Sequence, residues 1–449
     1  MLMRRGSRNA ALAACASFLF TVAVTGCGSD DPGNAVAPPA VRLYGTDGNM
    51  GNSFGAEFTD QAGLLAGMKG TTPLTPLSED FKTRLRSVAP KLGDVVYAAE
   101  TYDAVVISAL AAQLAGEVTP ARIAEQINGV TTAGTQCDTV GDCLRLARSG
   151  ADIEYRGVSL KRGGFTDAGE PSTATFATLH FDTNNQINDG KTEFVGAGNE
   201  ADTTRKRPPA AERQRPNNRS EQPLTIGGLL PKTGDLAILY PPLAAGAALA
   251  IKEINSEGGV LGRKVQWVDG DDGTRPDVAK ATVREHVAAG VHVIIGPGAS
   301  GIARAVLPDV VAAGVVLFSP CNTDAGLSTV EDKGLYFRTA PSDLLQARAL
   351  ADVILRDGSQ RVAIVARKDS YGDGLQSSVR TELERTGIAA DQLKLLSYEP
   401  PAGPATPLDF SAGAAELKNF RPDAVVLIGF GESAQVIKAL AAAGVTLRH

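Results

Sequence analysis

Between residues 225 and 319 the chain contains TIGGLL (225–230), PPLAAGAALAIKEIN (241–255), KVQWVD (264–269), PDVAKATVREHVAAG (276–290), VHVIIG (291–296), IARAVLPDVVAAG (302–314) and VVLFS (315–319). The short runs are rich in β-branched residues and predict buried strands, whereas the longer segments predict helices. Glycines such as Gly258 and Gly259 close the helical segments. Strands that alternate with helices in this way are typical of a parallel α/β sheet.

Three further apolar runs continue the alternation, namely RVAIVA (361–366), LKLLSY (393–398) and AVVLIG (424–429). The runs together predict a doubly wound α/β fold with helices on both faces of parallel sheets. The 449 residues of the chain suit two lobes, at roughly 100 to 200 residues per domain. In this class of fold, ligands bind beyond the carboxyl ends of the strands, where helix N-termini present amide groups.

The same residues resemble a known family. Residues 224–449 resemble the amino-terminal half of the leucine/isoleucine/valine-binding proteins, the type I periplasmic solute-binding family of ABC importers. Residues 41–195 resemble the carboxy-terminal half of that family, through the motifs VRLYGTDGNMGN (41–52), YAAETYDAVVISALAA (97–112), CDTVGDC (137–143) and GFTDAGEPSTATFATLHFD (164–182). The halves stand in reversed order, so the resemblance implies two hinged lobes in a circularly permuted chain.

The permutation makes a specific prediction, which is that strand 41–45 lies parallel to strand 424–428 and beside it. A natural permutation, a rearranged gene and a sequence-assembly error fit the order of the halves equally well. Residues 196–223 contain a basic, proline-rich stretch without large apolar side chains and are expected to form a disordered linker. The family's crossings between lobes imply lobe 1 at about 72–156 and 224–340, and lobe 2 at 41–71, 157–195 and 341–449.

The first residues predict export. Arginines precede the apolar run ALAACASFLFTVAV (11–24), which is too short to be a convincing membrane-spanning helix. Val24-Thr25-Gly26-Cys27 resembles a lipobox, so residues 1–27 are expected to be a lipoprotein signal with Cys27 as the lipidated residue. An ordinary signal peptide with an incidental cysteine is the alternative. Residues 28–40 have the composition of a flexible tether, which predicts a protein anchored by lipid to the extracytoplasmic side of the cell membrane.

An exported chain meets oxidising conditions, and Cys137 and Cys143 close a short loop, so a disulfide is expected there. The C-x5-C spacing also matches a local pair in some members of the family. A zinc site would need two further ligands, and the four histidines are scattered along the chain. The net charge of −6 with interspersed signs gives no reason to expect a nucleic-acid partner.

The predicted ligand site combines an anion-binding end and a cation-binding end. Ser300 begins the helix 302–314, and the resemblance assigns its hydroxyl to the ligand carboxylate, with contacts from Cys321 and Thr323 in SPCNTD (319–324). Ser300 as a simple cap of its own helix is the alternative. Asp47 falls where relatives hold the ligand ammonium, although Asp47-Gly48 would also suit an ordinary turn.

Three aromatic residues complete the predicted site. The resemblance places Tyr371 in DSYGDG and Phe430 in GFGES against the cleft, and Tyr240 in AILYPP is expected to approach it from the other lobe. Ordinary packing in the core or on the surface is the alternative for each ring.

No enzyme motif competes with this interpretation. Residues 296–301 satisfy G-x-G-x-x-G, but the next strand ends in Ser319 and Pro320 rather than in an acidic residue that would hold a ribose. The chain contains no G-x-S-x-G, P-loop or H-E-x-x-H motif. We therefore expect neither a catalytic function nor a cofactor or metal.

The sequence thus predicts a monomeric, lipid-anchored binding protein that captures an amino acid for an ABC permease, with branched-chain amino acids as one candidate class. A ligand-sensing module for an amide or a small organic acid is the alternative, because a fold does not choose its function.

Overall fold

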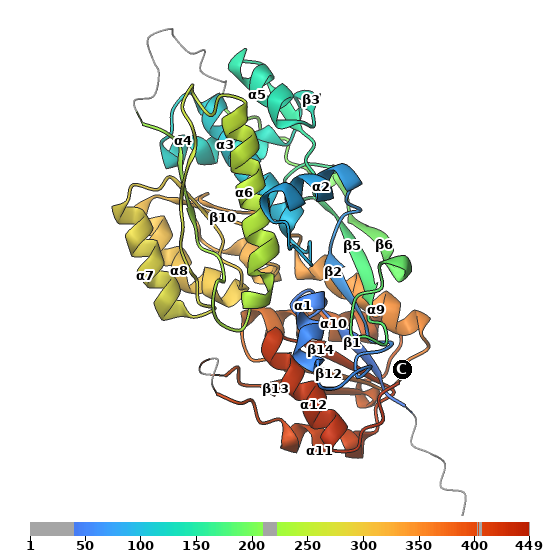
Figure 1. Cartoon of the computed structure of the whole chain (residues 1–449). Helices are drawn as coiled ribbons and strands as arrows, with labels where there is room; N and C mark the ends of the chain where they lie inside the picture. Colours follow the sequence, from blue (N-terminus) through green and yellow to red (C-terminus); the bar gives the residue numbers. More distant parts are fainter. Residues whose placement is uncertain (1–39, 210–221, 402, 404–405, 449) are drawn as a thin grey trace, which may run out of the picture. The chain divides into compact units, whose positions relative to one another are not determined.

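The computed structural model describes residues 40–209, 222–401, 403 and 406–448. The predicted signal peptide, with Cys27, lies outside the described residues, and so does nearly all of the predicted tether. The described chain forms two large sheets with helices packed on both faces of each (Figure 1). The predicted α/β fold class is confirmed.

The first large sheet is built from five parallel strands in the order β11-β10-β9-β7-β8. Its strands are β7 (Thr225–Gly228), β8 (Gln266–Val268), β9 (Val293–Ile295), β10 (Val316–Ser319) and β11 (Tyr336–Arg338). Successive side chains of a strand point to opposite faces. Val293 and Ile295 accordingly pack with α3 (Ala98–Ala115) and α6 (Tyr240–Ser256), whereas Ile294 packs with α7 (Pro276–Ala288) and α8 (Ser300–Ala313).

The second large sheet has seven strands in the order β13-β12-β14-β1-β2-β5-β6. Its strands are β1 (Arg42–Gly45), β2 (Lys69–Pro73), β5 (Thr173–His180), β6 (Glu193–Gly198), β12 (Val362–Arg367), β13 (Leu393–Tyr398) and β14 (Ala424–Ile428). The first five strands in the order are parallel, but β5 and β6 are antiparallel to their neighbours. The sheet is therefore mixed, which the sequence did not predict.

Twelve α-helices cover the sheets in the described part of the chain. They are α1 (Asn52–Gly55), α2 (Glu79–Val88), α3 (Ala98–Ala115), α4 (Pro120–Val130), α5 (Val140–Arg148), α6 (Tyr240–Ser256), α7 (Pro276–Ala288), α8 (Ser300–Ala313), α9 (Asp343–Arg356), α10 (Ser370–Arg385), α11 (Ser411–Phe420) and α12 (Ala434–Ala442). Helices α9 and α10 pack on one face of the seven-stranded sheet, and α11 and α12 pack on the other.

The predicted pairing of the two ends of the chain is confirmed. Strand β1 lies parallel to β14, with Arg42 opposite Ala424 and Tyr44 opposite Val426. Val41 also bridges to Leu447, so the beginning and the end of the described chain lie side by side. Segments far apart in sequence thus share the centre of one sheet. The permuted order relative to other family members stays a prediction.

Helix α3 lies at the centre of the lobe that contains the five-stranded sheet. All its residues are buried, since it packs against α6, α4 and α5 as well as against the sheet. Gly246 of α6 permits the close approach, because a Cβ there would lie 2.3 Å from the carbonyl oxygen of Ala98. The stretch Ala237–Ser256 is long and apolar enough to span a membrane, but half of it is buried inside the protein, as expected of a core helix.

A small two-stranded sheet carries the predicted disulfide. Strands β3 (Thr135–Cys137) and β4 (Ile153–Tyr155) pair in parallel, and Cys137 is bonded to Cys143 of α5 with a Cα–Cα distance of 5.4 Å. The predicted pairing is confirmed. Cys143 is fully buried, so the bond fastens α5 to the core.

We expect the Cys137→Ala/Cys143→Ala variant to lose about 2 kcal/mol of unfolding free energy, because the crosslink restricts a short loop in the unfolded chain. Urea unfolding of the variant and of the wild type, each with and without reductant, measures the difference. Reductant should weaken the wild type and leave the variant unchanged. Equal midpoints for all four samples would contradict the prediction.

The segment expected to be a linker is partly structured. Residues 196–198 complete β6, and residues 199–209 lie against the loop before β5 and against α4. Thr204, for example, donates its hydroxyl to Asp167, and its main-chain amide donates to the carbonyl of Phe165. Residues 210–221 lie outside the described residues. These local contacts could not be predicted from the basic composition of the segment.

A buried arginine joins the end of β11 to two loops. Arg338, 1% exposed, donates to the carboxylate of Glu170 through both Nε, at 2.8 Å, and Nη2. Its Nη1 donates to the carbonyl oxygens of Asn322 and Asp324, and its Nη2 also reaches the hydroxyl of Ser328. Neighbouring carboxylates outweigh the effect of burial and raise the pKa of Arg338, so the group stays charged.

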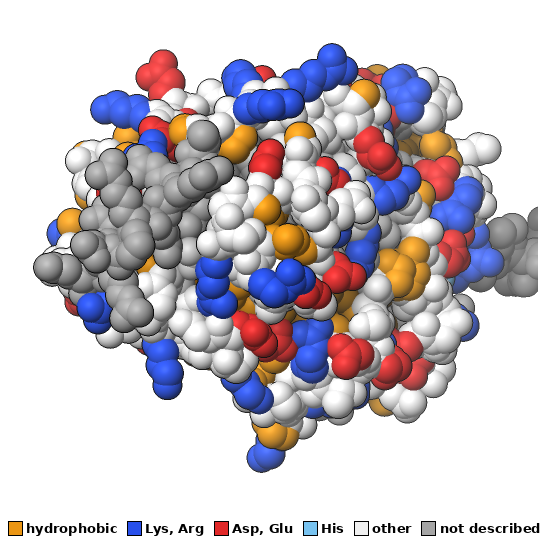
Figure 2. All heavy atoms as spheres, turned by 90° about the horizontal axis from the view of Figure 1, so that it is seen from above, with side chains coloured by type: hydrophobic (Ala, Val, Ile, Leu, Met, Phe, Trp, Pro, Cys, Tyr) orange, Lys and Arg blue, Asp and Glu red, His pale blue; other side chains and the backbone are white. Residues whose placement is uncertain are grey.

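Charges of both signs share the surface drawn in Figure 2. Lys and Arg side chains are interspersed with Asp and Glu, and only small hydrophobic patches lie between them. This pattern is typical of a solvated surface.

Candidate ligand-binding site

The carboxyl ends of strands from both large sheets meet at one cavity. Six of the residues predicted to bind ligand line it, joined by four further lining residues: Asp47, Ser300, Cys321, Thr323, Tyr371 and Phe430, with Leu236, Leu239, Gly298 and Ala299. Asp47 follows β1 of the seven-stranded sheet, and Ser300 begins α8 after β9 of the five-stranded sheet. The seventh predicted residue, Tyr240, does not line this cavity; its hydroxyl lies near Asp269 and Lys232.

The cavity is small, and the side chains at its two ends are buried. Its volume is about 10 Å³, roughly the space that one water molecule needs. Asp47 and Ser300 are only 5% and 2% exposed. An amino acid therefore enters this site only if the surrounding groups move apart.

Asp47 accepts three hydrogen bonds from side chains far away in the sequence. The hydroxyl of Tyr97 donates to Oδ2 at 2.8 Å, and Tyr371 and Gln346 donate to Oδ1 at 2.8 and 2.9 Å. Burial raises the pKa of Asp47, and these hydrogen bonds oppose the rise. Tyr97 and Gln346 were not predicted. Tyr97 lies in the motif at 97–112, but its side-chain partner could not be inferred from that pattern.

The backbone after Asp47 forms the turn that the alternative interpretation expected. The amide of Asn49 donates to the carbonyl of Thr46 at 3.0 Å. Only glycine fits at position 48, because a Cβ there would lie 2.5 Å from the carbonyl oxygen of Gly429. The turn thus carries the carboxylate of Asp47 into the cavity, and the two interpretations of this residue are compatible.

Ser300 links α8 to the loop after β10. Its Oγ accepts hydrogen bonds from the amides of Thr323 and Asp324, both at 3.2 Å. It does not cap α8, because Ala299 holds the N-cap position without a side-chain hydrogen bond. The hydroxyl proton therefore stays available to an acceptor in the cavity, next to the positive end of the helix dipole.

The loop 319–324 is held against the turn at residues 296–298. Ser319 donates its hydroxyl to the carbonyl of Pro297 at 2.9 Å, and Asn322 donates to the carbonyls of Pro297 and Gly298. The amide of Gly298 donates to Asp272 at 2.8 Å. Burial raises the pKa of Asp272 to about 7. Since a protein carboxyl group accepts from this amide, the second glycine of the G-x-G-x-x-G match is not free to bind a pyrophosphate.

An aromatic pair covers one side of the cavity. The rings of Tyr371 and Phe430 stack with centroids 5.4 Å apart and planes 22° apart. The guanidinium of Arg367 lies 3.9 Å from the centroid of the Phe430 ring. The sequence predicted the two rings but not the arginine, which ends the apolar strand β12.

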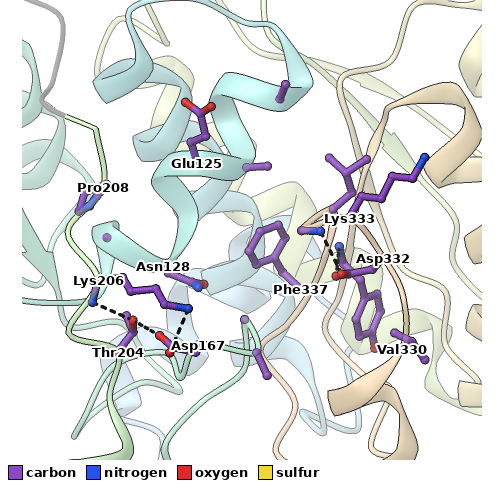
Figure 3. Close-up of a pocket in the computed structure, with 18 of the residues that line it drawn as sticks. Glu125, Asn128, Asp167, Thr204, Lys206, Pro208, Val330, Asp332, Lys333 and Phe337 are labelled. Atoms are coloured by element: carbon purple, nitrogen blue, oxygen red, sulfur yellow. Dashed lines mark hydrogen bonds and ion pairs between the residues drawn. The ribbon is translucent and has the colours of Figure 1, made fainter.

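A larger cavity lies elsewhere in the molecule. It measures about 700 Å³ and is bordered by α4, the segment 204–209 and the loop 327–337 (Figure 3). None of the predicted ligand-binding residues lines it. Its acidic groups have local partners, because Asp167 binds Thr204 and Lys206 and because Asp332 accepts from the amide of Gly334. The small cavity, where the strand ends converge, is therefore the better candidate site.

Two α/β lobes whose strand ends share one polar cavity are typical of the type I periplasmic binding protein fold. The chain belongs to the periplasmic binding protein family, whose model matches residues 223–449. This family consists of solute-binding proteins rather than enzymes, in agreement with the lack of an enzyme motif.

Named relatives match about half of the chain. The chain is 32% identical over 212 residues to the Leu/Ile/Val-binding protein BraC3 of Rhizobium johnstonii. The aligned residues cover 46% of this chain and 54% of the relative. It is 30% identical over 201 residues to the Leu/Ile/Val-binding protein of Escherichia coli. This alignment covers 44% of the present chain and 53% of the relative. The chain thus spans about half the length of these relatives.

Solved structures of similar proteins include two that each cover 50% of this chain. The leucine binding protein of Thermotoga maritima matches with 24% identity and a TM-score of 0.44, over 61% of its own chain. A branched-chain amino acid transporter substrate binding protein of Streptococcus pneumoniae, solved with isoleucine, matches with 24% identity and a TM-score of 0.42, over 63% of its own chain.

Proposed function

We propose that the protein captures an amino acid between its two lobes and delivers it to an ABC permease. The observation that carries the proposal is the convergence of Asp47 and Ser300, from different sheets, on one cavity. A carboxylate and a hydroxyl at a helix N-terminus are complementary to the two charged groups of a zwitterion. The names of the relatives make leucine, isoleucine and valine the first ligands to test.

Ligand binding involves closure of the lobes in this proposal. Lobe 1 comprises about residues 72–156 and 224–340, and lobe 2 comprises 41–71, 157–195 and 341–449. The carboxylate of the ligand meets Ser300 and Thr323 in lobe 1, and its ammonium meets Asp47 in lobe 2. Closure around the ligand then creates the surface that the permease recognises.

The location of the protein is the second part of the proposal. Lipidation of Cys27 would hold the binding lobes on the extracytoplasmic side of the membrane, beside the permease. Metabolic labelling with a radioactive fatty acid tests this step, with Cys27→Ser as the unlabelled control. Equal labelling of both proteins would refute lipidation at Cys27.

Isothermal titration of the purified protein with the standard amino acids tests the ligand class. We expect at least one amino acid to bind with a Kd of about 1 μM or below, corresponding to roughly 8 kcal/mol. Simple amides and organic acids form the comparison set. If only these compounds bind, the amino-acid function is wrong and the sensing alternative gains support.

A further inference from the structure

A group of charged side chains lies directly behind the aromatic pair of the candidate site. Arg367, whose side chain is 5% exposed, donates to Glu432 at 2.7 Å and to Asp369 at 2.5 Å. The carboxylate of Asp235 lies 3.8 Å from Nη2 of the same arginine. None of these residues was predicted to have a role.

One contact of this group joins the two sheets. Asp235 lies in the segment that follows β7 of the five-stranded sheet, whereas Arg367 ends β12 of the seven-stranded sheet. The main chain supports the same contact, because the amide of Gly431 donates to the carbonyl of Asp235 at 3.1 Å. The Asp235–Arg367 pair therefore exists only while the two sheets are held close together at this edge.

The surroundings maintain the charge of Arg367, whereas Asp235 depends on Arg367 to offset the effect of burial. Burial works against the charge of Arg367, but Glu432 and Asp369 outweigh it and raise the pKa of Arg367. Burial raises the pKa of Asp235, and the positive charge of Arg367 opposes that rise. An arginine with several carboxylate partners keeps a defined orientation, because its planar group donates along fixed directions.

A continuous series of contacts leads from Asp235 to the predicted ammonium site. Arg367 packs on Phe430 at 3.9 Å, and Phe430 stacks on Tyr371 at 5.4 Å. The hydroxyl of Tyr371 then donates to Asp47 at 2.8 Å. A shift of Arg367 would consequently move the ring that fixes the carboxylate of Asp47.

We propose that Arg367 is a positioning residue of the ligand site, which holds Phe430 and Tyr371 in place and, through Asp235, ties them to the opposite lobe in the closed cleft. The role of Arg367 at a ligand site rests on the proposed function. Its effect on the separation of the lobes can be measured without any ligand. The immediate consequence of the proposal is that the Asp235–Arg367 pair favours the closed over the open arrangement of the lobes.

The test compares Asp235→Asn with the wild type in the full-length protein. The substitution keeps the shape of the side chain and the main-chain bond to Gly431 but removes the charge. Spin labels at Arg284→Cys on α7 and Ala415→Cys on α11, both exposed positions, report the separation of the lobes. We expect the open population to rise roughly two- to fivefold, the effect of losing one partly exposed ion pair.

Glu399→Gln is the matched control. It also removes an ion pair near β12, between Lys368 and Glu399, but this pair is exposed and lies within one lobe. Its label distances should equal those of the wild type. Identical distance distributions for Asp235→Asn, Glu399→Gln and the wild type would overturn the proposal, whatever ligand the protein binds.

A second arm follows ligand release with L-leucine as the probe. Dissociation requires opening, so Asp235→Asn should release the probe roughly two- to fivefold faster with little change in the association rate. Arg367→Met should have a larger effect than Arg367→Lys, which retains the charge that faces Asp235. Equal dissociation rates for Asp235→Asn and the wild type would count against the proposal.

Failure of leucine and every other amino acid to bind would refute the proposed function. The distance measurement alone would then decide the role of Arg367.

Discussion

Asp47→Asn is expected to weaken amino-acid binding roughly tenfold to a hundredfold, because a charge-assisted hydrogen bond contributes about 1.5 to 3 kcal/mol. The carboxylate is buried and already accepts hydrogen bonds from Tyr97, Tyr371 and Gln346. Asparagine fits the same space but offers no negative charge to an ammonium group. Titration of the variant and the wild type with leucine measures the loss.

The same titration with 4-methylpentanoate, which is leucine without its amino group, isolates the charge. Asp47→Asn should leave the binding of this compound almost unchanged, whereas Ser300→Ala should weaken both compounds because both carry the carboxylate. Asp60→Asn, an exposed change in the same segment, is the control. If Asp47→Asn binds its best amino acid as tightly as the wild type, a neutral or purely anionic ligand becomes the better hypothesis.

Arg338→Met is expected to lower the unfolding free energy by about 3 to 5 kcal/mol, the usual effect of removing one partner of a buried ion pair. Methionine fills much of the space but leaves Glu170 without its cation, and it frees the carbonyls of Asn322 and Asp324 that Arg338 now binds. Urea unfolding followed by circular dichroism measures the loss.

Two further variants separate charge from packing in that experiment. Adding Glu170→Gln to Arg338→Met should recover part of the stability, because the unpaired carboxylate is then gone. Arg348→Met on α9 removes an exposed ion pair with Glu382 and should change stability by less than about 1 kcal/mol. A loss at Arg338 no larger than that at Arg348 would show that the buried network contributes little.

Most strands of the parallel sheets could be predicted because their sequence pattern is local. All seven apolar runs singled out by the sequence contain strands, at positions within a few residues of those expected. Strands β2, β5, β6 and β11 of the two large sheets were not predicted. The run 173–180 is rich in Thr and Ala, and β6 is an edge strand with exposed residues such as Phe194. Neither segment shows the continuous apolar run that identifies a strand buried on both faces.

The candidate site was predictable to the extent that its residues follow strand ends. Asp47 lies in the turn after β1, Ser300 begins α8, and Thr323 lies in the loop after β10; parallel strands bring such positions to one edge. Gln346 contacts Asp47 from α9, and Tyr97 contacts it from the N-cap position of α3; nothing local marks them as partners. Asp235 and Arg367 come into contact only because the two lobes lie close together. The sequence pattern of either segment alone does not predict such a contact.

The pairing of β1 with β14 has a consequence for how the molecule acquires its structure. Ribosomes make β1 before every other described strand, yet its neighbour β14 is the last of the described strands to be made. The five-stranded sheet lies between them in the chain and uses strands that follow one another closely, so it can assemble first. The centre of the seven-stranded sheet must wait until β14 has been made, and closing so long a loop slows the search for partners.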